Sequence, residues 1–196
     1  MSPLPAADRP GRWWLVTFNT YGTWLPGDPR GFQTWRGREY VPPPRRYAEA
    51  GEAAYDPAPY RARHAAARAS MTHEPVVFDR RRMGCCLEAM REEFDLIRVE
   101  PACVAVGDWH VHALLRVGGY PIRTAVGRLK AAASRLLGQY DLKPPKVWAD
   151  GCHMVSKDDD AAVRRAFDYV LKHADEGALT HTWFRPLGAD FSRRPR

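Results

Sequence analysis

Two adjacent apolar segments most constrain the fold of this chain. Residues 99–106 (VEPACVAV) and 109–117 (WHVHALLRV) are rich in strand-forming side chains, and a Gly-Asp dipeptide at 107–108 separates them. This pattern predicts a β-hairpin. Because successive side chains of a strand alternate between its two faces, His110 and His112 must project from the same face of the second segment.

Two imidazoles on one strand face form a metal clamp with two nitrogen donors. Each one replaces an aliphatic side chain whose burial would stabilise the fold by roughly 1.5 to 3 kcal/mol, so the arrangement points to another benefit. We infer that this benefit is chemistry on a phosphate. The alternative is a chance pair of histidines on a half-solvated sheet face, and the pair alone does not exclude it.

The order of the other expected elements predicts the fold class. A first strand is expected at 13–21, a helix after an N-cap at Asp79, and a second amphipathic helix at about 122–136. A short strand is expected within 146–156, and the acidic run 158–160 opens a last helix. The order predicts an α+β fold with a ferredoxin-like βαββαβ antiparallel sheet and an extra C-terminal helix.

Length and charge narrow the domain organisation and the partner. The 196 residues suit one domain, 1–196, with a basic Pro/Arg-rich insertion at about 32–72 that includes a short Ala-rich helix near 60–69. The preceding stretch, 22–31, is dense in turn residues and is expected to be a structured loop or a DNA-contacting loop. The formal net charge of +7 favours a polyanionic partner, with nucleic acid first, over a generic basic surface.

The cysteines and the N-terminus bear on the compartment. The cysteines show no Cys-x-x-Cys pair and no zinc-finger spacing, which favours a reducing cytoplasm. The first twelve residues are polar without an apolar segment of the signal-peptide type, and no stretch approaches the ~20 apolar residues of a membrane span. We therefore expect a soluble, cytoplasmic protein without a membrane partner. The cysteines are Cys85, Cys86, Cys103 and Cys152.

Two further polar residues lie on the expected last helix. Tyr169 and His173 are four residues apart and therefore share one side of the helix, at the border of its apolar stripe. Tyr169 can serve as a nucleophile and His173 as a third metal ligand if this helix crosses the face that bears His110 and His112. The alternatives are a half-buried tyrosine with a solvated hydroxyl and a histidine that suits a helix C-terminus.

Together these motifs resemble those of the HUH nucleases. A His-hydrophobic-His strand followed by a helix with one tyrosine and a metal-binding residue four positions later is similar to the single-tyrosine transposases of the insertion-sequence-200-like family, which are related to the transposases associated with repetitive extragenic palindromes. The opening VTFNTYGTWLPGDPRG also resembles a subset of that family. Two positions depart from it, since Trp109 stands where the family often has Asn, and His173 where it commonly has Gln.

The resemblance implies a DNA endonuclease that cleaves and rejoins single-stranded DNA, next to hairpins, during transposition. A divalent metal ion, Mg²⁺ or Mn²⁺, would be held by His110, His112 and His173, and Tyr169 would attack the phosphorus to give a 5′-phosphotyrosine and a free 3′-OH. Because imidazole suits Mn²⁺ better than Mg²⁺, an all-imidazole site predicts that Mn²⁺ supports activity at least as well. The resemblance also implies a homodimer and a nucleoid-associated location.

Aromatic and basic side chains are candidates for contact with single-stranded DNA, because stacking surfaces and basic grooves hold such strands. Lys172 is also a candidate for lowering the pKa of Tyr169. For the tryptophans the alternative is burial in the core, and for the cationic side chains it is simple solvation. The candidates are Trp24, Arg30, Trp35, Arg36, Lys130, Arg135, Trp148 and Lys172.

Three other functions remain open at the level of the sequence. A domesticated relative would bind structured DNA without transposing, although intact His110, His112 and Tyr169 argue against lost chemistry. A metal-dependent phosphoesterase would use water as the nucleophile and leave Tyr169 with a structural role. An RNA-binding ferredoxin-like domain is the weakest alternative, because no aromatic strand motif of the RNA-recognition type is present.

Overall fold

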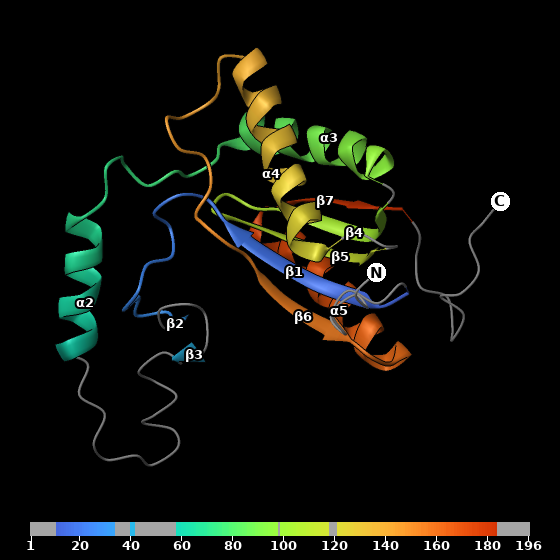
Figure 1. Cartoon of the computed structure of the whole chain (residues 1–196), viewed down its shortest axis with the longest axis horizontal. Coiled ribbons are helices and arrows are strands. Elements are labelled where there is room, and N and C mark those ends of the chain that lie inside the picture. Colours follow the sequence, from blue (N-terminus) through green and yellow to red (C-terminus); the bar gives the residue numbers. More distant parts are fainter. Residues whose placement is uncertain (1–10, 34–39, 42–57, 98, 118–120, 184–196) are drawn as a thin grey trace, which may run out of the picture.

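Strand β1 (Trp13–Asn19) lies inside a five-stranded antiparallel sheet of order β6-β1-β5-β4-β7 in a computed structural model of the chain (Figure 1). The structure describes residues 11–33, 40–41, 58–97, 99–117 and 121–183. The other elements are β2 (Phe32–Gln33), β3 (Tyr40–Val41), α2 (Ala58–Ala69), α3 (Arg80–Leu96), β4 (Val99–Val106), β5 (His110–Val117), α4 (Ile122–Gln139), β6 (His153–Lys157), α5 (Asp160–Lys172), the 3₁₀ turn η3 (His173–Glu176) and β7 (Leu179–Thr182).

The connectivity confirms the predicted fold class. The elements β1, α3, β4, β5, α4 and β6 follow one another along the chain, and their strands take the order β6-β1-β5-β4. This is the ferredoxin-like βαββαβ arrangement with antiparallel neighbours. The predicted extra C-terminal helix is α5.

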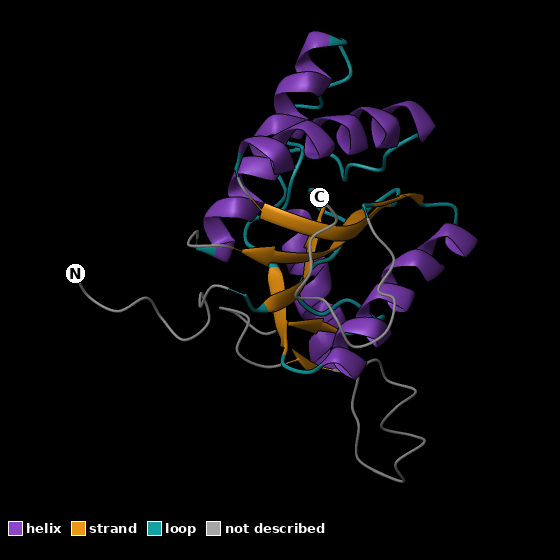
Figure 2. Ribbon diagram, turned by 90° about the vertical axis from the view of Figure 1, so that its right-hand side faces the viewer, coloured by secondary structure: helices purple, strands orange, loops and turns teal. Residues whose placement is uncertain are grey.

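Two hydrophobic clusters lie on opposite faces of the sheet, so the sheet is covered by helices on both sides (Figures 1 and 2). The larger cluster joins one sheet face to α3 and α4, and its fully buried side chains include Phe94 and Leu129. The smaller cluster joins the other face to α5 through Val163, Phe167 and Val170. Alternation along the strands distributes side chains to the two clusters: Val16 and Phe18 of β1 face α3 and α4, whereas Trp13 faces α5.

The helices begin where the sequence predicts. Asp79 caps α3 by accepting a hydrogen bond from the backbone N–H of Arg82 at 2.8 Å, and Asp159 caps α5 by accepting one from Ala162 at 2.6 Å. Helix α5 ends at Lys172, and the chain tightens into η3 from His173 and then reverses at Gly177, whose φ of +91° is readily adopted by glycine. The reversal leads into β7.

Some boundaries differ from the sequence-based expectations. Strand β7 was not expected, because four residues with two threonines and a histidine give little apolar alternation; it forms because it pairs with the edge of β4. Strand β5 begins at His110, so Trp109 belongs to the hairpin turn. In the 146–156 stretch only His153 onward forms a strand, and Trp148 makes an isolated bridge to Thr20.

The described part of the insertion packs against the loop that follows β1. Helix α2 forms at the predicted Ala-rich stretch, and the loop backbone approaches it at Gly27. A Cβ atom at Gly27 would clash with the carbonyl oxygen of Tyr60, and the φ of +84° there also favours glycine. The predicted DNA contacts Trp35 and Arg36 lie outside the described residues.

In the described ranges, no helix combines the length and the apolar character that a membrane span requires.

Candidate metal and tyrosine site

The site begins on β5, where His110 and His112 face the α5 side of the sheet. Val111 between them points into the opposite cluster, as strand alternation requires. Both histidines are buried, with only 6% and 5% of their surface exposed. In the antiparallel register His112 pairs with Thr17 of β1, and His110 pairs with Asn19.

Helix α5 brings Tyr169 and His173 to this face. Its apolar stripe packs against the smaller cluster and fixes the rotation of the helix. His173 is buried, whereas Tyr169 is 46% exposed. The helix therefore places one buried imidazole and one accessible phenol beside the two strand histidines.

The three histidines form a compact cluster. One nitrogen from each of His110, His112 and His173 lies within 4.8 Å of the other two. The ring centroids are 4.6 Å apart for His110 and His112, 4.2 Å for His112 and His173, and 5.2 Å for His110 and His173. Imidazole nitrogens grouped in this way are potential ligands of one divalent ion.

Hydrogen bonds orient two of the rings. Nδ1 of His173 donates to the backbone carbonyl of Tyr169 at 2.9 Å, which leaves Nε2 with a free lone pair. Nδ1 of His112 lies 2.8 Å from Oγ1 of Thr17, and donation to that oxygen leaves its Nε2 free in the same way. Metal-binding histidines are commonly held by such bonds from the second ring nitrogen.

His110 provides a direct test of whether the residues suit a metal ion. Both of its ring nitrogens are buried and have no hydrogen-bond partner among the described residues. A buried polar atom without a partner costs about 1–3 kcal/mol, so it is tolerated where another partner, such as a cation, satisfies it. The donor set and these unpaired nitrogens fit a divalent metal ion.

The electrostatics favour the neutral form of His110 and His112, which is the form that binds metals. Burial, followed by the charges of His173 and Arg30, lowers the pKa of His110 to about 4. Burial, followed by the charges of His110 and His173, lowers the pKa of His112 to about 2. Both rings are therefore neutral at physiological pH.

Tyr169 packs directly against the cluster. Its ring centroid lies 5.2 Å from that of His112 and 4.8 Å from that of His173, with near-perpendicular planes in both pairs. Burial, followed by the charge of Glu176, raises the pKa of its hydroxyl. Lys172, which was expected to lower this pKa, lies exposed on the same helical turn but is not among the groups that shift it.

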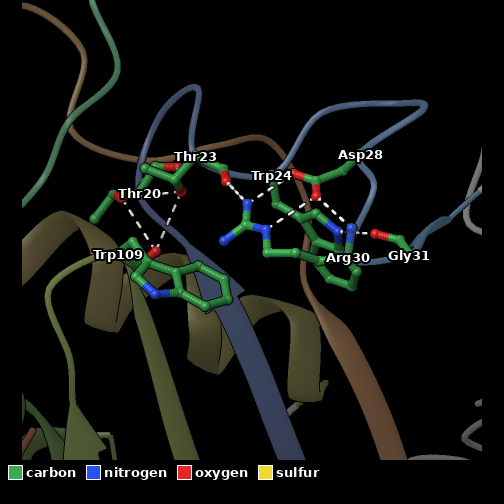
Figure 3. Close-up of polar contacts among 7 residues, drawn as sticks. All are labelled: Thr20, Thr23, Trp24, Asp28, Arg30, Gly31 and Trp109. Atoms are coloured by element: carbon green, nitrogen blue, oxygen red, sulfur yellow. Dashed lines mark hydrogen bonds and ion pairs between the residues drawn. The ribbon is translucent and has the colours of Figure 1, made fainter. Parts of the chain in front are cut away.

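The loop after β1 lies against Trp109, the residue before His110 (Figure 3). The guanidinium of Arg30 lies over the ring of Trp109, 4.7 Å from its centroid, and the Trp109 and His110 ring centroids are 4.0 Å apart. The carboxylate of Asp28, 5% exposed, accepts hydrogen bonds from the Arg30 side chain at 2.7 and 2.9 Å. Half of the Arg30 side chain stays exposed, so its positively charged guanidinium is held in place at the rim of the site.

Other contacts shape the same loop. Trp24 donates its indole N–H to the carbonyl of Gly31, and Arg30 donates to the carbonyl of Thr23. Thr20 and Thr23 donate to the carbonyl of Trp109 at 3.1 and 3.3 Å. Of the predicted DNA contacts in this loop, the structure brings Arg30 close to the histidines and gives Trp24 a role in the loop itself.

The predicted contacts Lys130 and Arg135 lie on α4, which covers the sheet face opposite the histidines. Lys130 donates to the carbonyls of Ala149 and Gly151 at 2.8 and 2.6 Å, and Arg135 pairs with Glu93 at 3.3 Å. Their bonds hold the fold together, and the structure does not bring them to the site.

The structure places the predicted DNA contact Trp148 in the core. Its ring is buried in the larger cluster between Phe18 and Phe78, at centroid distances of 5.3 and 5.5 Å. Its indole N–H donates to the carbonyl of Lys130 and the hydroxyl of Ser134. A tryptophan so enclosed has no face available to a base.

The sequence reasoning missed four residues of the site: Thr17, Asn19, Asp28 and Trp109. Thr17 and Asn19 occupy alternate positions of a predicted strand, which indicates that one face of β1 is polar near its end. Which strand they oppose depends on the sheet register, and this has no local signature. For Trp109 the sequence offers only its departure from the resembled family.

Comparisons with known proteins show a likeness in fold to solved structures. No protein-family model and no curated protein matches the chain. A solved structure described as the REP associates tyrosine transposase bound to a REP hairpin aligns with 90% of this chain and 74% of that chain, at 10% sequence identity and a TM-score of 0.49.

Proposed function

We propose that this protein is a metal-dependent, single-tyrosine endonuclease and strand transferase that acts on single-stranded DNA. The observation that carries the proposal is the packing of an accessible tyrosine ring against two members of a buried three-histidine cluster, at 5.2 and 4.8 Å. A metal site alone would suit many reactions. A phenol next to it supplies a nucleophile that can remain covalently attached to its product.

His110, His112 and His173 would hold the divalent cation through one nitrogen each. The chemistry that such a cation supplies is Lewis-acid polarisation of the scissile phosphate. Imidazole ligands add no negative charge, so the site stays attractive to a phosphodiester. The buried, hydrogen-bonded rings of His112 and His173 keep the donors preoriented.

Tyr169 would carry the bond exchange. Its hydroxyl oxygen forms a bond to phosphorus while the bond between phosphorus and the 3′ oxygen breaks, and the hydroxyl proton is balanced by the proton that the departing 3′ oxygen takes up. The products are a 5′-phosphotyrosine and a free 3′-OH. Attack by another 3′-OH reverses the step and rejoins strands without ATP.

Arg30 is the residue that we assign to the DNA backbone next to this centre. Its guanidinium is held by Asp28, lies over Trp109 and remains half exposed at the rim of the site (Figure 3). A planar guanidinium suits phosphate oxygens. The net charge of +7 is consistent with a polyanionic partner. Hairpin recognition, a homodimer and a nucleoid-associated location extend the proposal on the strength of the motif resemblance.

The test is a denaturing gel with end-labelled single-stranded oligonucleotides from the flanks of the gene, in Mn²⁺, comparing wild type with Tyr169→Phe. A heat-stable protein-DNA adduct that is absent from the variant supports the proposal. Cleavage without an adduct, unchanged in the variant, indicates a water-using phosphoesterase. Binding without cleavage indicates a DNA-binding protein that does not transpose.

A further inference from the structure

Asn19 presents a second buried polar atom without a partner beside the histidine cluster. Its Oδ1 atom is buried and has no hydrogen-bond partner in the described part of the chain. Asn19 is the residue of β1 directly opposite His110. The two unpaired groups are therefore neighbours across the sheet.

Both side chains lie on the face that bears the site. Thr17, two residues earlier on β1, reaches Nδ1 of its own partner His112, so Thr17 and with it Asn19 project toward the α5 side. Directly opposed residues of an antiparallel pair have Cβ atoms about 4.5–5.5 Å apart. Asn19 is thus within reach of the space that the three imidazoles enclose.

The cross-strand pairs Thr17–His112 and Asn19–His110 differ in their hydrogen bonding. Thr17 and His112 satisfy one another at 2.8 Å, whereas no hydrogen bond joins Asn19 to His110. An amide oxygen and an imidazole N–H are compatible partners, and leaving both unpaired destabilises the fold. The side chains of this pair are consequently arranged for a third partner.

The hydrogen-bonding chemistry of Oδ1 of Asn19 indicates what kind of partner it requires. Oδ1 is an acceptor and requires a donor or a cation. The oxygens of a phosphodiester are themselves acceptors, so DNA phosphate does not satisfy it. An amide carbonyl oxygen is a ligand for hard divalent cations.

We infer that Oδ1 of Asn19 is a fourth protein ligand of the divalent cation, the oxygen donor beside three imidazole nitrogens. The inference rests on the proposed metal site and extends it. An oxygen ligand makes the site more suitable for Mn²⁺ and Mg²⁺ than three imidazoles alone.

The experiment measures Mn²⁺ binding to the metal-free full chain by calorimetry, together with the melting temperature with and without Mn²⁺. The variants are Asn19→Leu, which removes the oxygen at similar volume, and Asn19→Asp, which adds a negative charge. Gln139→Leu, which removes an exposed amide at the end of α4, is the matched control.

We expect Asn19→Leu to raise the Mn²⁺ dissociation constant by about 10- to 100-fold, the range found for groups that support a metal site. We expect its metal-free melting temperature to be unchanged or higher, because an unsatisfied atom has been removed, and its stabilisation by Mn²⁺ to be smaller. Asn19→Asp should bind Mn²⁺ more tightly than the wild type, which keeps the test informative if Asn19→Leu does not fold. Gln139→Leu should bind as the wild type does.

Wild-type affinity in Asn19→Leu would overturn the assignment of Asn19 and leave the three-histidine site intact. Weaker binding by Asn19→Asp than by the wild type would also overturn the assignment. Absence of Mn²⁺ binding by the wild type would overturn the proposed metal site itself. The adduct assay with Tyr169→Phe, run on the same preparations, separates that failure from a failure of the tyrosine chemistry.

Discussion

Nδ1 of His112 lies 2.8 Å from Oγ1 of Thr17, its partner across the β1–β5 pair. This bond presents the opposite ring nitrogen of His112 to the other two histidines. The hydroxyl of a strand residue that bears no obvious catalytic group thus orients a proposed metal ligand.

Thr17→Val should therefore weaken metal binding while keeping the shape of the side chain. Because loss of a bond that orients a ligand typically costs about 10- to 100-fold in metal affinity, we expect a Mn²⁺ dissociation constant raised within that range. Thr17→Ser, which retains the hydroxyl, is the control and should stay close to the wild type in the same titration. Equal affinities for the two variants would contradict the orienting role.

A second prediction concerns the assembly of the site within one chain. Tyr169 contacts His112 and His173 of its own chain, so nucleophile and metal ligands are already together. Mixing Tyr169→Phe with His112→Ala should not restore adduct formation with labelled DNA, because no subunit of a mixed dimer would contain both groups. Recovery of a substantial fraction of wild-type activity in the mixture would mean that the tyrosine acts on the partner's site.

A third prediction concerns the metal. Removal of divalent ions with a chelator should abolish adduct formation, and Mn²⁺ should restore it at least as well as Mg²⁺, because imidazole nitrogens bind Mn²⁺ more readily. His173→Gln substitutes an oxygen donor for one imidazole and should raise the Mg²⁺-supported rate relative to the Mn²⁺-supported rate. Strictly Mg²⁺-dependent activity of the wild type would exclude His173 as a direct ligand.

A fourth prediction concerns the loop that holds Arg30. Burial of Asp28 opposes its ionisation, but the hydrogen bonds and charge of Arg30 outweigh this effect and hold the pKa of the carboxyl below its usual value. Because folding lowers this pKa, the ionised carboxyl stabilises the protein above the unfolded pKa near 4. This contribution is lost as the pH falls through the folded pKa.

Asp28→Asn should consequently lower the free energy of unfolding at pH 7 by an amount on the order of 1 kcal/mol, given the half-exposed Arg30. The difference between wild type and variant should shrink as the pH falls from 5 toward 3. Denaturant melts at several pH values measure both quantities. A difference that is constant over this range would exclude the ionised Asp28–Arg30 pair as its cause.

A fifth prediction distinguishes a role of Trp148 in the core from a role in DNA contact. Trp148→Phe removes two hydrogen bonds of a buried indole and part of its volume, so the unfolding free energy should fall by about 1–3 kcal/mol. The affinity for single-stranded DNA, measured by fluorescence anisotropy below the melting temperature, should not change. The comparison variant Arg30→Ala should bind single-stranded DNA more weakly.

Local patterns in the sequence were sufficient for much of the site. The alternation of a strand puts His110 and His112 on one face whatever surrounds them, and helical periodicity puts Tyr169 and His173 on one side of α5. Capping at Asp79 and the apolar stripes predicted the helices, and the order of the elements predicted the ferredoxin-like sheet. These features depend on bond geometry over a few residues, so they can be predicted from the sequence.

Tertiary structure alone decided which of these faces meet. The packing of α5 on the histidine side of the sheet brings His173 to His110 and His112, and the β1–β5 register places Thr17 and Asn19 opposite them. The same long-range packing buried Trp148 in the larger cluster and added β7 at the sheet edge. Such contacts join residues far apart along the chain, and their free energy depends on the whole core, so no short stretch of sequence specifies them.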